Sequence, residues 1–82
     1  MHRTHDICIA AIGSMTASIK AERALLAAGL SVCVIALLPE ETRRGCAYGI
    51  QYPCEAEAQV RSLLREAHIA VSQYLKRGGK AL

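Results

Sequence analysis

Four short runs rich in apolar residues alternate with two segments of helical spacing, and their order restricts the folds open to this chain. The runs cover residues 7–12, 32–37, 47–52 and 69–74. Apolar runs of this length, bounded by turn residues, are typical of strands, whereas apolar residues at i, i+3 and i+4 are typical of a helix packed against a core. The predicted order is therefore strand, helix, strand, strand, helix, strand.

Cap and turn residues separate these elements where the order requires it. Ser14 or Thr16 can begin the first helix, because a side-chain oxygen there accepts from a free backbone N–H of the first turn. Gly29 supplies the left-handed position that ends a helix. Pro39 ends the second strand because proline donates no ladder hydrogen bond, and Pro53 favours the start of the second helix.

This order is the split βαβ arrangement of an α/β (α+β), ferredoxin-like βαββαβ two-layer sandwich. It predicts a four-stranded antiparallel sheet with two helices on one face. We expect a single domain over residues 1–82, with flexible tails at 1–6 and 76–82. Both alternating sets of side chains in residues 7–12 are apolar, so the second face of the sheet should also be covered. A homo-oligomer, most simply a dimer, is the expected cover.

Composition narrows the classes of function. The net charge is +3 and the positive residues are spread along the chain, with only three aromatic residues, so a nucleic-acid surface is disfavoured. No run reaches the roughly 20 apolar residues of a membrane span, and no signal peptide is recognised, which predicts a cytoplasmic protein. Neither a cofactor nor a metal site is predicted, because no Cys or His spacing suits one.

A reactive thiol is predicted at Cys46. This cysteine follows Arg43, Arg44 and Gly45 at the exit of a polar loop. Nearby positive charge lowers the pKa of a thiol below its free value of about 8.5 and raises the fraction of reactive thiolate. The topology places this loop at the end of the sheet where the first helix begins, so that Ser14 and free N–H groups should also favour an anion there. The plainer interpretation is a small residue that starts a strand.

The other three cysteines lack this setting. Cys8 and Cys33 lie in apolar runs and are expected to fill core space as small hydrophobic residues. Cys54 should lie near the start of the second helix, at the opposite end of a strand from Cys46. Four cysteines allow two disulfides, but a cytoplasmic chain with an adequate aliphatic core favours free thiols.

Three segments match a known pattern over about residues 7–73. They are Ser14 followed by residues 20–29, Leu38-Pro39 followed by a polar loop, and Gly45-Cys46 followed by a short strand. In these segments the chain resembles the selenium/sulfur carrier-like family of small bacterial domains. The glycine that often follows the family's cysteine is Ala47 here. The resemblance implies a carrier role for Cys46.

The predicted function is therefore that of a sulfur or selenium carrier. Cys46 would hold a sulfane atom received from a donor protein and pass it to an acceptor protein. Such a protein acts stoichiometrically, so a turnover enzyme is the less favoured class, although the sequence leaves this open. The alternative is a non-enzymatic binding or oligomerisation module, such as a subunit of a ring or shell, in which Cys46 is incidental.

Overall fold

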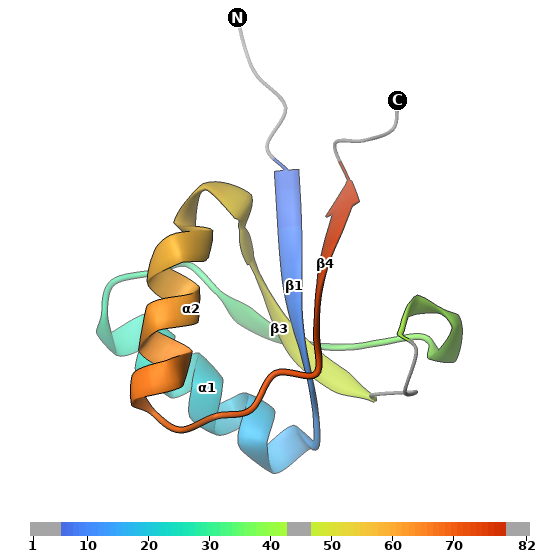
Figure 1. Cartoon of the computed structure of the whole chain (residues 1–82), viewed down its shortest axis with the longest axis horizontal. Coiled ribbons are helices and arrows are strands. Elements are labelled where there is room, and N and C mark those ends of the chain that lie inside the picture. The colour runs from blue at the N-terminus through green and yellow to red at the C-terminus, as the bar shows by residue number, and fades with distance from the viewer. Residues whose placement is uncertain (1–5, 43–46, 79–82) are drawn as a thin grey trace, which may run out of the picture.

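A four-stranded antiparallel sheet covered on one face by two helices forms the frame of the molecule (Figure 1). The computed structural model describes residues 6–42 and 47–78. The elements are β1 (Asp6–Gly13), α1 (Met15–Ala27), β2 (Cys33–Ala36), the 3-10 turn η1 (Pro39–Glu41), β3 (Tyr48–Pro53), the 3-10 turn η2 (Cys54–Ala56), α2 (Glu57–Glu66) and β4 (Gln73–Gly78). The strand order is β2-β3-β1-β4, so the predicted ferredoxin-like sandwich is confirmed.

The main core lies between the sheet and the two helices. Tyr52 and Ile50 of β3 are buried here against Leu25 of α1 and against Val60 and Leu64 of α2. These five side chains are each at most 1% exposed. Burial of apolar area at about 25 cal/mol per Å² holds both helices against the sheet.

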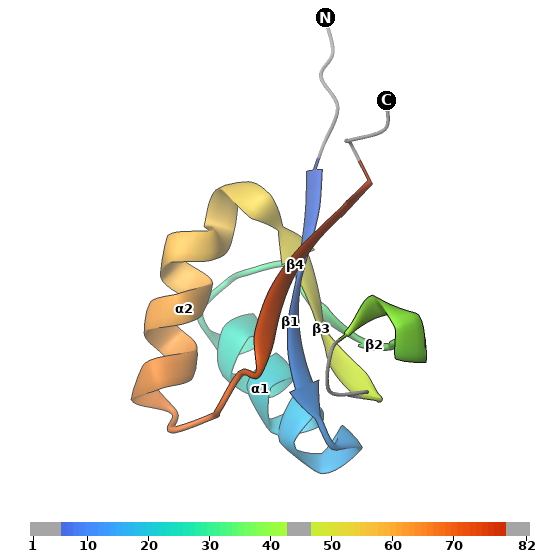
Figure 2. The same ribbon diagram turned by 45° about the vertical axis from the view of Figure 1, so that its right-hand side comes forward.

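A second, smaller cluster covers part of the opposite face. The segment that follows β2 folds over this face, and η1 lies on the side of the sheet away from the helices in both ribbon views (Figure 2). Leu37 is packed there with Ile9 and Ala11, which are both 0% exposed within the single chain. The apolar face that predicted a second copy is therefore covered in part by the chain itself.

The fourth strand lies further along the chain than expected. Residues 69–74 were predicted as the strand, but β4 runs Gln73–Gly78 and pairs with β1 over its whole length. Ile69 belongs instead to the connection after α2, where it is 9% exposed and packs in the main core. Its backbone N–H bonds to the carbonyl of Leu64, which closes the helix end. Residues 76–78, expected in a tail, belong to the sheet.

Ser14 begins α1, as predicted. Its backbone is extended, with φ −90°, and its Oγ accepts from the N–H of Ala17 at 3.0 Å. Ser14→Ala should lower the free energy of unfolding by about 1 kcal/mol, because that N–H loses its partner. Urea unfolding measures this change. Thr16→Ala is the matched control, since Thr16 lies inside the helix, and an equal loss in both variants would contradict the assignment of the cap.

Candidate functional site

The structure describes the residues on both sides of the loop that carries the predicted thiol. Arg43, Arg44, Gly45 and Cys46 themselves lie outside the described residues. On one side Thr42 is buried, at 8% exposure. On the other side the carbonyl of Ala47 accepts from the N–H of Leu37 at 2.8 Å. The loop therefore starts and ends against the body of the domain.

Strand pairing places these loop ends at the edge of the sheet where α1 begins. Tyr48, two residues after Cys46, is opposite Gly13 of β1 and Ala36 of β2. Ser14 follows Gly13 directly and caps α1. The ends of the loop and the start of α1 thus share one end of the sheet, as the topology predicted.

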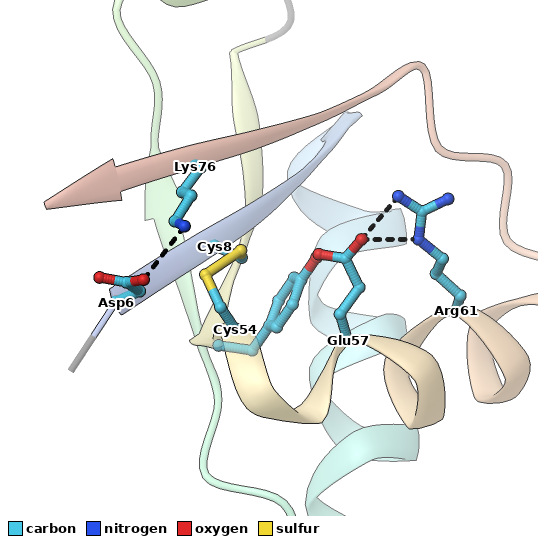
Figure 3. The surroundings of a disulfide bond; sticks show 7 residues. Asp6, Cys8, Cys54, Glu57, Arg61 and Lys76 are labelled. Carbon is cyan, nitrogen blue, oxygen red and sulfur yellow. Dashed lines mark hydrogen bonds and ion pairs between the residues drawn. A yellow bond between two sulfur atoms is a disulfide. The ribbon is translucent and has the colours of Figure 1, made fainter. Parts of the chain in front are cut away.

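Cys8 and Cys54 form a disulfide, so the expectation of free thiols at these positions is wrong. The two Cα atoms are 4.9 Å apart and the sulfur atoms are bonded at 2.07 Å (Figure 3). The reason is the register of the central strands. Cys8 lies opposite Tyr52, and η2 begins two residues after Tyr52 and turns Cys54 back over β1. Cys8 is 5% exposed and Cys54 is half-buried.

Cys33 is exposed, which contradicts the expectation of a core position. It begins β2, which lies at the edge of the sheet and pairs with β3 among the described strands. The Nε2 of Gln51, its partner across the two strands, donates to the Cys33 sulfur at 3.8 Å. Among the cysteines that the structure describes, Cys33 is the free thiol.

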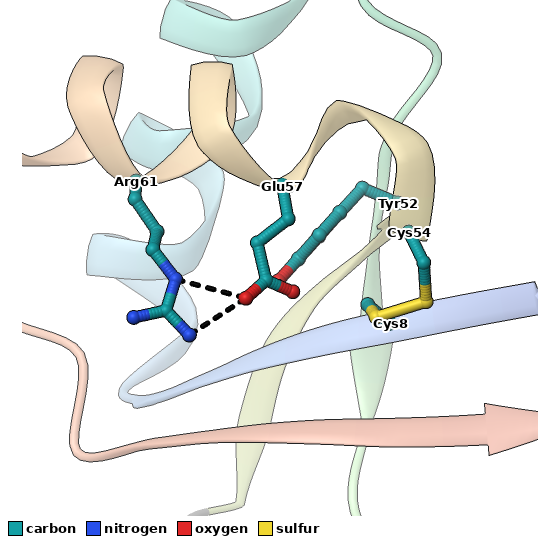
Figure 4. Close-up of polar contacts among 5 residues, drawn as sticks. All are labelled: Cys8, Tyr52, Cys54, Glu57 and Arg61. Carbon is teal, nitrogen blue, oxygen red and sulfur yellow. Dashed lines mark hydrogen bonds and ion pairs between the residues drawn. A yellow bond between two sulfur atoms is a disulfide. The ribbon is translucent and has the colours of Figure 1, made fainter.

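A polar cluster beside the disulfide joins α2 to the sheet (Figure 4). Glu57 accepts from the hydroxyl of Tyr52 at 3.2 Å through Oε1. Through Oε2 it accepts from Nε and Nη2 of Arg61 at 2.9 and 2.6 Å. The guanidinium of Arg61 also lies 4.0 Å from the ring centre of Tyr74 on β4. This cluster was not among the predicted sites, although the i, i+4 spacing of Glu57 and Arg61 is typical of an ion pair along a helix.

Burial raises the pKa of Tyr52 far above its usual range, and the charge of Glu57 and the hydrogen bond to it raise it further. In the unfolded chain this phenol ionises near pH 10. The folded state therefore holds a proton that the unfolded state loses, and stability falls as pH rises above about 10, by up to about 1.4 kcal/mol per pH unit.

Tyr52→Phe should reverse its effect on stability between neutral and alkaline pH. At pH 7 the variant loses the hydrogen bond to Glu57 and should be less stable by about 1 kcal/mol. Above pH 10 it lacks the ionisable phenol, so the deficit should shrink and then change sign. Urea unfolding at several pH values measures the difference, and a constant difference between pH 7 and 11 would contradict this prediction.

A pocket of about 350 Å³ opens beside the disulfide. Its lining includes both sulfur-bearing residues, the aromatic and aliphatic side chains of β4, and charged groups of both signs: Cys8, Cys54, Glu57, Arg61, Tyr74, Leu75 and Lys76. The ammonium of Lys76 lies 3.1 Å from a carboxylate oxygen of Asp6 on β1. The disulfide therefore lies beside a pocket whose two cations, Arg61 and Lys76, are each paired with a carboxylate.

Over residues 6–42 and 47–78, no three His, Cys, Asp or Glu side chains gather as metal ligands would. No helix there has the length and apolar character needed to cross a bilayer.

Comparison with known protein families shows to which of them this chain is related. The family described as "Putative Se/S carrier protein-like" matches residues 7–76. The chain belongs to this family. Neither a curated protein nor a solved structure matches it significantly. The match runs from the second residue of β1 into β4 and includes the loop with Cys46, so this Se/S carrier-like domain covers both helices, β2 and β3, and most of β1 and β4.

Proposed function

We propose that this Se/S carrier-like domain carries sulfur or selenium as a sulfane atom on Cys46. The Cys46 thiolate would attack the outer sulfur of a donor protein's persulfide. A new S–S bond forms to Cys46, the donor's S–S bond breaks, and its electron pair leaves with the donor thiolate. Transfer to the thiolate of an acceptor protein repeats the same exchange, so no external oxidant is needed.

The family match carries this proposal, because it spans the loop with the cysteine and extends over residues 7–76. The placement of the loop ends supports it. They lie at the end of the sheet where Ser14 caps α1, and a helix start favours an anion. Arg43 and Arg44 would add positive charge beside the thiolate, and Gly45 would let the backbone turn toward it.

A carrier needs surfaces that meet a donor and an acceptor, and self-association is a separate matter. The predicted dimer stays a prediction, and Ile9 and Ala11 no longer require one, because they are buried within the chain. Light scattering at several protein concentrations decides the oligomeric state. The cytoplasmic location also stays a prediction.

Loading with inorganic polysulfide tests the proposal. Sulfane sulfur should appear on Cys46 and be released as thiocyanate by cyanide, and Cys46→Ser should lose that sulfur. Cys46 should also react with iodoacetamide before the exposed Cys33, with an apparent pKa below about 8.5. Joint replacement of Arg43 and Arg44 by Gln should raise that value, whereas Arg23→Gln on α1 is the matched control. An unreactive Cys46 would instead favour the binding module.

A further inference from the structure

The disulfide beside α2 lies next to an open pocket that contains charged side chains, whereas a purely structural disulfide requires neither. Both cysteines line the 350 Å³ pocket, together with Arg61 and Lys76. Cys54 is half-buried, so one of the two sulfur-bearing residues is open to a small molecule that enters this pocket. Disulfides that are exposed in this way are the ones that exchange with thiolates.

We propose that the Cys8–Cys54 disulfide is a second cargo site, which binds hydrosulfide or hydroselenide directly. The inference rests on the proposed carrier function, because it supplies the same two elements by a different route. Hydrosulfide attacks the sulfur of Cys54 and keeps its own proton on the outer sulfur. An S–S bond forms to Cys54, the Cys8–Cys54 bond breaks, and its electron pair leaves on Cys8 as a thiolate.

This reaction balances within the pair. The incoming sulfur is oxidised to the sulfane level while the sulfur of Cys8 is reduced from disulfide to thiolate. Release is the reverse step, in which the Cys8 thiolate attacks the inner sulfur of Cys54 and expels hydrosulfide. The disulfide is restored, so the site takes up and returns its cargo without a separate oxidant or reductant.

The geometry assigns the two cysteines different roles. Cys54 is the more exposed residue, and it begins η2, which leads into the N-terminus of α2, where the incoming hydrosulfide anion is favoured. Cys8 is 5% exposed and lies in the central strand β1, so an attacking anion meets Cys54 instead and Cys8 becomes the leaving thiolate. Burial disfavours negative charge on Cys8, so this thiolate needs a cation nearby.

Lys76 is placed to stabilise that leaving thiolate. It is directly opposite Cys8 in the pairing of β1 with β4, so both side chains lie on the helix-facing side about 5 Å apart at Cβ. In the closed disulfide its ammonium contacts Asp6 at 3.1 Å, with the lysine side chain 59% exposed. Lys76 and Arg61 both line the pocket, and each is already paired with a carboxylate, Lys76 with Asp6 and Arg61 with Glu57. A small anion that enters the pocket therefore competes with these carboxylates for the two cations.

The test uses the oxidised full-length chain with Cys33→Ser and Cys46→Ser, so that only the pair remains. Sodium sulfide is added in small molar excess without air, and iodoacetamide stops the reaction. We expect one added sulfur atom capped by a carbamidomethyl group on Cys54, and a carbamidomethyl group on the sulfur of Cys8. An unchanged disulfide, or two alkylated thiols without added sulfur, would overturn the proposal.

The same loading experiment on the unsubstituted chain provides a second measurement if the double variant folds poorly. Cys46 and Cys54 fall between Arg44 and Arg61, and therefore in one tryptic peptide, so fragment spectra must separate them. Sulfide should load Cys54 and polysulfide should load Cys46. If sulfide fails to load Cys54 while polysulfide still loads Cys46, this inference is refuted. If polysulfide fails to load Cys46 while sulfide still loads Cys54, the proposed function is refuted.

Lys76→Gln tests the assignment of the leaving group. A less stable Cys8 thiolate is a poorer leaving group, so sulfide should load Cys54 more slowly in this variant than in the unsubstituted chain. Lys20→Gln is the matched control, because Lys20 is an exposed lysine on α1 away from the pocket. Equal rates in the Lys76 variant and the unsubstituted chain would remove Lys76 from the mechanism.

Discussion

Replacing both Cys8 and Cys54 with alanine should lower the free energy of unfolding by about 4 kcal/mol. The two residues are 46 positions apart, so the bond restricts more than half of the unfolded chain. The entropy of the unfolded state rises when that restriction is removed, while the strands that hold the two cysteines together stay paired. For a domain of this size the loss corresponds to a melting temperature lower by about 15 to 30 °C.

Urea unfolding with and without dithiothreitol measures this effect. The unsubstituted chain should lose stability on reduction, whereas the double alanine variant should be insensitive to the reductant. Cys33→Ala is the control, because its thiol is exposed and outside the disulfide. If reduction left the midpoint of the unsubstituted chain unchanged, the cross-link would contribute nothing to stability.

The same measurement bears on cargo binding at the pair. A chain with hydrosulfide on Cys54 has lost its cross-link, so its unfolding midpoint should approach that of the reduced chain. Cargo on Cys46 leaves the cross-link intact and should not move the midpoint in this way. Stability therefore distinguishes which of the two sites holds the sulfur.

Gly49→Ala should destabilise the fold by about 3 kcal/mol. Gly49 lies in β3 between β1 and β2, opposite Ala11 and Ile35. A Cβ at this position would come within 2.5 Å of the carbonyl oxygen of Ala10 and 3.2 Å of the Cα of Ala11. Both are backbone atoms of the neighbouring central strand, so neither moves without disturbing the sheet.

Whether Gly49→Ala lowers or raises stability depends on this steric contact and not on the replacement of glycine by alanine as such. An alanine without a clash would stabilise the chain by about 0.4–1 kcal/mol through the entropy of the unfolded state. Gln51→Ala, two residues along the same strand and half-buried, is the control and should change stability by about 0.5 kcal/mol or less. A Gly49→Ala protein as stable as the unsubstituted chain would show that β1 and β3 separate readily.

Local patterns predicted an element correctly where its residues serve that element alone. Residues 7–12 predicted β1, observed as Asp6–Gly13, and Gly29 ends the α1 region with a φ of 89°. The fourth strand was misplaced because Ile69 is apolar for a different reason. It packs under α2 from a connection, and a short apolar segment has the same composition in either role.

In the candidate site, too, some features could be predicted from the sequence and others could not. Ser14 could be identified as a cap from its type and position, since its hydrogen bond is to a residue three positions away. Cys33 was misassigned because an apolar run does not reveal whether its strand lies at the edge of the sheet. The cluster of Tyr52, Glu57 and Arg61 needed both the i, i+4 pair on α2 and the side of β3 that faces it.

The order of strands and helices, the start of α1 and the family of the chain could all be predicted from neighbouring residues and short motifs. The three-dimensional arrangement was needed to find that Cys8 bonds to Cys54, that Cys33 is exposed, and that Leu37 covers Ile9 and Ala11. Each of these depends on the register and order of strands that are distant in sequence. Such pairing is set by packing of the whole sheet, which no local pattern records.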